Sequence, residues 1–105
     1  MDLQKVKPEI DKYIKRLENE IPVEGVILYG SLAEGKAEKE SDVDLVVLSS
    51  KFSLMSDDER LKILYRNSIG FPYDLHVYGL TRNEFETASS LTTTGEVRKK
   101  GLQIV

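Results

Sequence analysis

Cysteine is absent from the 105-residue sequence. Without it the chain can form no disulfide, no thiolate nucleophile and no zinc site with cysteine ligands. Long apolar runs are absent too: no segment approaches the length of a transmembrane helix, and the first ten residues lack the apolar core of a signal peptide. We therefore expect a cytoplasmic protein that does not bind membranes.

An excess of positive charge is also missing. The 15 lysines and arginines are outnumbered by 18 aspartates and glutamates, which gives a formal net charge of −3. Non-specific attraction to nucleic acid depends on basic side chains that neutralise phosphates, so direct nucleic-acid binding is not expected. Arg98, Lys99 and Lys100 form a local basic cluster. We interpret it as favourable charge at the end of a short helix rather than as a phosphate or partner site.

The remaining composition is that of one globular domain over residues 1–105. Hydrophobic residues make up 40% of the chain and charged residues 31%, and the length is sufficient for a modest core. No internal repeat or low-complexity segment is visible.

An amphipathic helix is predicted at the start of the chain, because apolar residues recur there at steps of three and four. Pro22 should end this helix, since the residue before a proline avoids helical geometry. Pro8 leaves its first residue open, because proline fits best in a first turn. The apolar positions are Val6, Ile10, Tyr13, Ile14, Leu17 and Ile21.

Three short apolar stretches predict β-strands at residues 25–30, 42–49 and 73–80. The segment between the second and third is long enough to hold a helix, so these two strands can run parallel. The first strand would then be antiparallel to the second. Its carboxyl end would lie at the same sheet edge as the starts of the other two.

Capping-box patterns predict two further helices. Ser56 and Glu59 open one after the second strand, and Thr81 and Glu84 open another after the third. A short helix over 94–100 and an edge strand within the last four residues complete the chain. The predicted fold class is α/β (α+β), with a small mixed β-sheet and helices packed on it.

Acidic residues gather at the predicted sheet edge. Asp42 and Asp44 flank Val43 and share one face of their strand, because alternate side chains point the same way. Asp74 starts the third strand, and His76 follows on the same face. Three converging carboxylates are a suitable site for Mg²⁺, which prefers oxygen ligands. Two such ions can clamp the attacking and leaving oxygens of a phosphoryl transfer. We interpret His76 as lining the rim of this site.

Gly30 and Ser31 supply a complementary feature at the end of the first strand. Glycine lets backbone N–H groups approach a phosphate, the serine hydroxyl adds a donor, and a helical turn beginning at Leu32 would direct its positive end to the anion. The segment matches neither the Walker A sequence nor the dinucleotide-binding G-x-G-x-x-G pattern.

Together these residues resemble the signature of the DNA polymerase β-type nucleotidyltransferases, and in particular the minimal nucleotidyltransferases. That signature is Gly-Ser, a spacer, Asp-x-Asp and a third Asp on a later strand. Here it is Gly30-Ser31, ten residues, Asp42-Val43-Asp44, and then Asp74 within YDLHVY. Gly35 and Ser41 also stand where this family commonly has glycine and serine.

The resemblance implies a role for each of these residues. Asp42 and Asp44 would bind the two Mg²⁺ ions that hold a nucleoside triphosphate, expected to be ATP. Asp74 would be the third metal ligand and would help to activate the attacking hydroxyl. The triphosphate would be contacted by the residues of the Gly-Ser segment and its spacer, namely Gly30, Ser31, Lys36 and Ser41.

The acceptor is expected to come from another protein. Larger nucleotidyltransferases add domains that hold their acceptor, whereas the catalytic core occupies this chain. Minimal nucleotidyltransferases are frequently antitoxins paired with HEPN-domain toxins, and some of them adenylylate a tyrosine of the toxin. The resemblance therefore implies transfer of AMP from ATP to a hydroxyl on a HEPN-type protein partner.

Two other functions remain open. Many relatives have a basic residue where this chain has Glu34, and Lys36 is close enough in sequence to compensate. An acidic residue at that position keeps open a non-catalytic antitoxin that neutralises its partner by binding. The other alternative is a homodimer that transfers nucleotides to an antibiotic or another small molecule.

Overall fold

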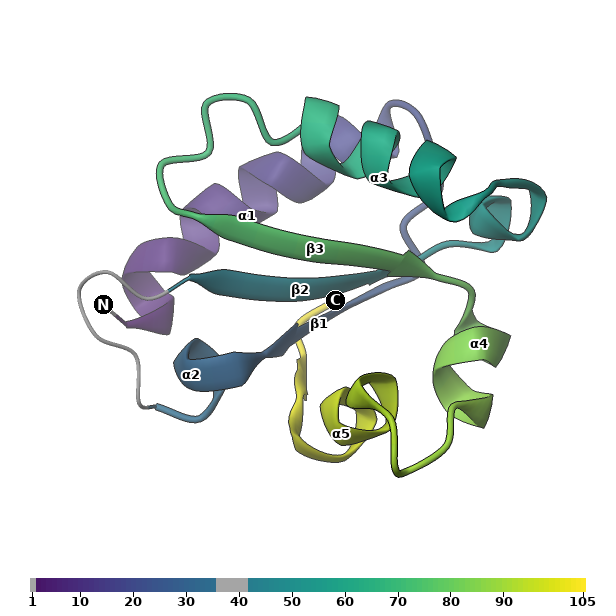
Figure 1. Ribbon diagram of the computed structural model, residues 1–105. Helices are drawn as coiled ribbons and strands as arrows, with labels where there is room; N and C mark the ends of the chain where they lie inside the picture. The colour runs from purple at the N-terminus through teal and green to yellow at the C-terminus, as the bar shows by residue number, and fades with distance from the viewer. Residues whose placement is uncertain (1, 36–41) are drawn as a thin grey trace.

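The computed structural model describes residues 2–35 and 42–105. In this part of the chain, a four-stranded sheet with the strand order β3-β2-β1-β4 carries helices on both faces (Figure 1). The elements in chain order are α1 (Leu3–Glu18), β1 (Gly25–Tyr29), α2 (Gly30–Ala33), β2 (Val43–Leu48), the 3₁₀ helix η1 (Ser50–Leu54), α3 (Asp57–Arg66), β3 (Leu75–Leu80), α4 (Arg82–Thr87), α5 (Thr93–Lys100) and β4 (Leu102–Gln103).

The strand directions are those predicted from the sequence. β1 and β2 are antiparallel with Tyr29 opposite Asp44, and β2 and β3 are parallel with Asp44 opposite His76. β4 pairs antiparallel with β1 and forms an edge of two residues, shorter than the four-residue segment in which we expected it. The mixed sheet confirms the predicted fold class. It also brings the end of β1 and the starts of β2 and β3 to one edge.

Helices α1 and α3 cover one face of the sheet and form the main core with it (Figure 1). Alternate residues of β2 (Val43, Leu45 and Val47) point into this core and are fully buried. The apolar stripe of α1 lies over them, and each large side chain buried in this way stabilises the fold by about 1.5–3 kcal/mol. The stripe consists of Val6, Ile10, Tyr13, Ile14 and Leu17.

The structure fixes the start of α1, which the sequence left open, and ends the helix earlier than predicted. The helix begins at Leu3, because the Asp2 carboxylate accepts a hydrogen bond from the backbone N–H of Lys5 at 3.0 Å and caps the first turn. Pro8 therefore lies inside the helix rather than in its first turn. The helix ends at Glu18, three residues before the last apolar position of the pattern.

Both predicted capping boxes are formed. In α4 the Thr81 side chain accepts from the Glu84 backbone N–H at 3.1 Å, and the Glu84 carboxylate accepts from the Thr81 backbone N–H at 2.7 Å. The same carboxylate accepts from Arg60 at 2.7 Å, which links α4 to α3. Among the helices within residues 2–35 and 42–105, none combines the length and the hydropathy that a bilayer crossing requires.

The second face of the sheet is only partly covered. Helix α5 packs Val97 against Ile27, Val46 and Leu48, with Phe85 of α4 beside them. This second cluster lies over β1 and the far ends of β2 and β3. The part of the face nearer to α3 stays open to solvent, and the candidate site occupies this face.

Candidate functional site

Asp42 and Asp44 lie on the partly covered face at the start of β2. Val43 between them is fully buried in the main core, whereas both aspartates keep partial contact with solvent. The alternation follows from the pleat of the strand. Two carboxylates are thereby held side by side against a largely apolar sheet.

The charge of this pair is unfavourable as it stands. Burial raises the pKa of Asp44, the neighbouring Asp42 carboxylate raises it further, and His76 offsets part of the effect. A raised pKa means that the environment disfavours the charged form of the carboxyl group. A bound cation would remove this penalty, so the donor set of Asp42 and Asp44 fits a hard divalent metal ion.

His76 lies beside both aspartates. It is the cross-strand neighbour of Asp44, and its Nε2 atom is 3.0 Å from Oδ2 of Asp42. Sequence reasoning placed this histidine at the rim and did not identify its contact with Asp42. The sequence indicated that His76 lies at the site, because it follows Asp74 by two residues and shares its strand face. It could not show that His76 contacts Asp42, because this contact depends on the register between β2 and β3.

Asp74 is at the same edge of the sheet, where its backbone is hydrogen bonded to β2. The residue is exposed just before β3, and its backbone carbonyl accepts a hydrogen bond from the Val43 N–H at 2.8 Å. Within the described ranges, no three side chains of the His, Cys, Asp and Glu types lie close enough together to hold a metal ion. The structure thus places His76 against Asp42 and opposite Asp44, and it holds the backbone of Asp74 at the same edge.

Gly30 and Ser31 lie next to Asp44 at the turn from β1 into α2. Gly30 has φ +77°, and a Cβ atom at this position would overlap Oδ2 of Asp44. Only glycine allows so close an approach in this backbone conformation. Leu32 is buried in the main core and fixes the turn. Lys36 and Ser41, the other predicted phosphate contacts, lie outside the described residues.

A small cavity of about 190 Å³ opens beside this turn. Gly30 and Glu34 line one side of it, and Lys100 of α5 lines the other. The Lys100 Nζ atom forms an ion pair with Glu96 at 3.3 Å. Sequence reasoning treated the basic cluster of 98–100 as a helix end and did not place Lys100 at the site. No sequence pattern could have done so, because the contact depends on how α5 packs against β1.

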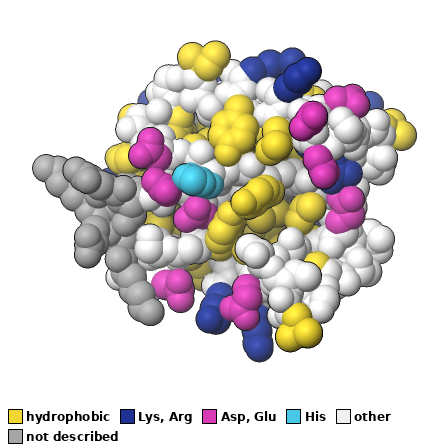
Figure 2. Space-filling model, in the orientation of Figure 1, with side chains coloured by type: hydrophobic (Ala, Val, Ile, Leu, Met, Phe, Trp, Pro, Cys, Tyr) yellow, Lys and Arg dark blue, Asp and Glu magenta, His cyan; other side chains and the backbone are white. Residues whose placement is uncertain are grey.

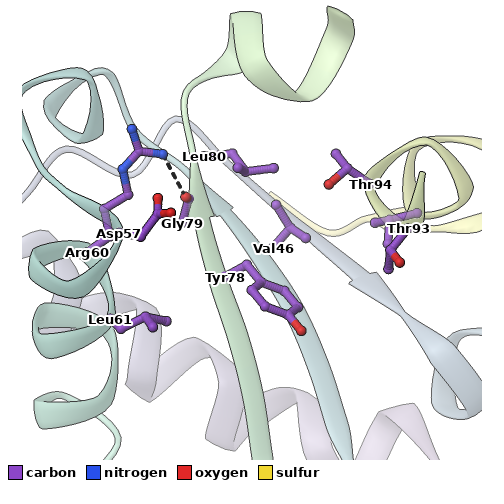
Figure 3. A pocket seen from close by; sticks show the side chains of 10 residues that line it. Val46, Asp57, Arg60, Leu61, Tyr78, Gly79, Leu80, Thr93 and Thr94 are labelled. Carbon is purple, nitrogen blue, oxygen red and sulfur yellow. Dashed lines mark hydrogen bonds between the residues drawn. The ribbon is translucent and has the colours of Figure 1, made fainter. Parts of the chain in front are cut away.

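A larger cavity of about 420 Å³ continues along the same face (Figure 3). The two cavities share Thr93 and Val97 as lining residues. The space-filling view shows apolar side chains beside the histidine on this face, with acidic side chains to either side (Figure 2). The sheet provides Val46, Tyr78, Gly79 and Leu80, helix α3 provides Asp57, Arg60 and Leu61, and α5 adds Thr94.

Comparison with protein families gives a match to the nucleotidyltransferase domain over residues 10–100. The chain belongs to this family. The match includes the Gly30-Ser31 turn, Asp42, Asp44, Asp74 and the whole of α5. It confirms the family that these residues resemble. A comparison of the nucleotidyltransferase domain with curated proteins finds no match.

Solved structures with the same fold include toxin–antitoxin proteins. A toxin–antitoxin with AMP-PNP is 23% identical, with a TM-score of 0.66, and the match covers 90% of this chain and 71% of that chain. The toxin–antitoxin MntA-HepT is 20% identical, with a TM-score of 0.62 and coverage of 94% and 71%. A structure from Sulfolobus solfataricus described as a nucleotidyltransferase is 18% identical, with a TM-score of 0.68 and coverage of 94% and 78%. At these identities the likeness establishes the fold.

Proposed function

We propose that this nucleotidyltransferase domain transfers AMP from ATP, in a metal-dependent reaction, to a hydroxyl group of a protein partner. One observation carries the proposal: the Asp44 carboxylate lies directly against Gly30, and Asp42 lies beside it on the same partly open face of the sheet. Paired carboxylates beside a phosphate-binding turn are what a metal-bound triphosphate requires.

Asp42 and Asp44 would hold the metal, expected to be two Mg²⁺ ions. When bound, the metal neutralises the triphosphate and favours displacement of pyrophosphate. Asp74 lies beside Asp42 through its backbone hydrogen bond to Val43. It would be the third ligand and would orient the attacking hydroxyl.

The triphosphate would lie over the Gly30-Ser31 turn. The backbone of Gly30 and the hydroxyl of Ser31 supply donors there, and Lys36 and Ser41 are further candidates from the spacer. Lys100 would add a positive charge from α5, because it lines the same cavity as Gly30 and Glu34. In this way a cation distant in sequence would offset the acidic residue at position 34.

ATP and a protein acceptor are the favoured substrates. The structures that share this fold include one of a toxin–antitoxin with AMP-PNP, an ATP analogue, and one of the pair MntA-HepT. By analogy this chain would be an antitoxin, and its acceptor a HEPN-type toxin. Such an antitoxin would silence its toxin by modifying it.

Glu34 favours a second candidate function, that of an antitoxin that neutralises its partner by binding alone. Its carboxylate lines the cavity beside Gly30 and would repel a triphosphate. The two functions differ in what the paired aspartates do. Under the binding function, replacing Asp42 and Asp44 together by Asn would leave neutralisation intact.

Pyrophosphate release tests the proposal. The chain would be mixed with ATP, Mg²⁺ and the purified product of the adjacent gene. We expect release with the wild-type chain and loss of at least 100-fold with Asp44→Asn, since metal-bound charge stabilisation contributes several kcal/mol. Asp58→Asn is the matched control, because Asp58 is an exposed carboxylate of α3 that lines neither cavity. Equal release by Asp44→Asn and wild type would refute the proposal.

A further inference from the structure

The larger cavity lies one step along the sheet from the aspartates. The register places Tyr29, Asp44 and His76 side by side on neighbouring strands. The next row on the same face contains Val46 and Tyr78, which form the floor of the cavity (Figure 3). Two residues of strand separate the rows by about 7 Å. A group seated in the cavity is therefore within side-chain reach of Asp44 and His76.

The geometry of the proposed reaction also places the attacking hydroxyl on the side of the larger cavity. In an in-line displacement the attacking and leaving oxygens lie on opposite sides of the phosphorus. Under the proposed function the leaving pyrophosphate is on the side of Gly30, which follows β1. The attacking hydroxyl must then arrive from the side of β3, where His76 and Tyr78 lie. This step rests on the proposed function.

Large apolar side chains are exposed on that side. Tyr78 is 51% exposed on the cavity floor, Leu61 of α3 is 36% exposed on its wall, and Tyr65, one helical turn further along α3, is 42% exposed. The volume of about 420 Å³ lies in the range of cavities that take compact ligands. It can receive one or two large side chains.

A partner cannot easily pair its backbone with β3, although β3 is an edge strand. The hydroxyl of Tyr65 accepts a hydrogen bond from the Val77 N–H at 3.3 Å, and Arg60 donates one to the Gly79 carbonyl at 3.1 Å (Figure 3). Both groups belong to the outer edge of β3, so side chains of α3 already occupy it. Recognition must then come from side chains that enter the cavity.

The charge around the cavity selects the kind of partner. The Asp57 carboxylate lines it, and the positive charge of Arg60, another lining residue, is paired with Glu84 at 2.7 Å. Figure 2 shows acidic side chains on both sides of the apolar surface. Such a rim attracts a basic segment and repels an acidic one. The acidic residues of the rim are Asp57, which lines the cavity, and Glu84, which is paired with Arg60, and Asp42 and Asp44 lie further along the same face.

We propose that the larger cavity is the acceptor-docking site, and that it receives a large apolar or aromatic side chain from a basic segment of the partner. Val46, Leu61 and Tyr78 contact that side chain, while the rim carboxylates pair with the flanking basic residues. Docking there brings the acceptor hydroxyl to Asp44 and His76 from the side opposite the leaving group.

A peptide titration followed by NMR tests the proposal. The ligand is a nonapeptide in which lysines flank a Tyr-Leu pair, and the comparison peptide has glutamates in place of the lysines. We expect saturable shifts of the amide signals of Val46, Tyr78 and Val97 with the lysine peptide. The glutamate peptide should bind at least tenfold more weakly. Shifts confined to other regions, or equal binding of the two peptides, would overturn the proposal.

Substitutions of residues that line the cavity test whether the peptide binds there. Tyr78→Ser and Leu61→Ser should each weaken the lysine peptide about tenfold, as expected for loss of a central apolar contact. Ile69→Ser is the control, because Ile69 is 77% exposed and lines neither cavity. Unchanged affinity in both cavity variants, each of which can be checked for folding by its NMR spectrum, would contradict the proposal.

Four further outcomes separate this proposal from its rivals and from the proposed function. If ATP alone shifts the amide signals of Tyr78 and Val46, the cavity is a nucleotide subsite. If the chain forms a dimer that buries Tyr78, the cavity is an interface between two copies of this chain. Either result would overturn the proposal. Peptide binding in the cavity without AMP transfer to any partner would support docking and count against the proposed function. Transfer that survives both cavity substitutions would refute docking and leave the proposed function standing.

Discussion

Gly30 lies directly against the Asp44 carboxylate, and a Cβ atom at Gly30 would overlap its Oδ2 atom. The Gly-Ser and Asp-x-Asp parts of the motif are therefore one packed unit rather than two separate signals. The same contact explains why residue 30 is a glycine in a backbone conformation that other residues rarely adopt.

Gly30→Ala should destabilise the fold by more than the cost of its backbone conformation alone. The matched control is Gly35→Ala, because Gly35 has a similar φ of +71° and, among residues 2–35 and 42–105, no atom lies within 4 Å of where its Cβ would be. We expect a loss of roughly 1–2 kcal/mol for Gly35→Ala. Urea unfolding should show a larger loss for Gly30→Ala. Equal losses would contradict the close packing of Gly30 against Asp44.

Asp44→Asn should raise the melting temperature at pH 7 in the presence of a chelator. Burial and the neighbouring Asp42 raise the pKa of Asp44, so its charged form is less stable in the folded state than in the unfolded state. The charged Asp44 carboxylate destabilises the folded state fully at pH values above its raised pKa. This destabilisation disappears as the pH falls below the ordinary pKa of about 3.9. The stabilisation by Asn should disappear over the same range. An unchanged or lower melting temperature at pH 7 would count against the electrostatic description of the site.

Glu84→Gln should lower stability at neutral pH but not in acid. The Arg60 hydrogen bonds are the main cause that lowers the pKa of Glu84, and the Thr81 backbone adds to the effect. A lowered pKa gives stability that is present above the ordinary value and is lost as the pH falls through the folded value. Because the Glu84 side chain is 42% exposed and screened by water, we expect a loss of roughly 1 kcal/mol at pH 7. Urea unfolding at pH 7 and pH 3 should show the difference only at pH 7.

Lys100→Ala should weaken ATP binding about fivefold, which corresponds to about 1 kcal/mol for one exposed charge near a phosphate. Lys99→Ala removes the same charge from the neighbouring position, but Lys99 does not line the cavity beside Gly30. Calorimetric titration with a non-hydrolysable ATP analogue and Mg²⁺ measures both variants. If Lys99→Ala weakens binding as much as Lys100→Ala, Lys100 has no specific place at the triphosphate.

Much of the fold could be predicted because the sequence carries local signals for it. The capping residues Ser56 and Thr81 start the helices that they predict, and the apolar stretches form the expected strands. The shared face of Asp42 and Asp44 follows from the period of a strand. The end of α1 could not be predicted in the same way, because apolar residues beyond Glu18 are buried without being helical.

The missing parts of the site depend on tertiary structure. The contact of His76 with Asp42 requires the register of β2 and β3, and the place of Lys100 requires the packing of α5 on β1. Asp74 lies just before β3, where the alternation of a strand no longer fixes the direction of a side chain. The sequence predicts that the backbone of Asp74 lies at the site, but it does not determine the direction of the Asp74 carboxylate.

Intact-mass spectrometry of the partner tests the central claim most directly. The purified product of the adjacent gene would be incubated with ATP, Mg²⁺ and either the wild-type chain or Asp42→Asn. The account predicts that the partner gains the mass of one or more adenylyl groups with the wild-type chain and gains none with the variant. An unmodified partner that still forms a stable complex with the wild-type chain would contradict it and would favour neutralisation by binding alone.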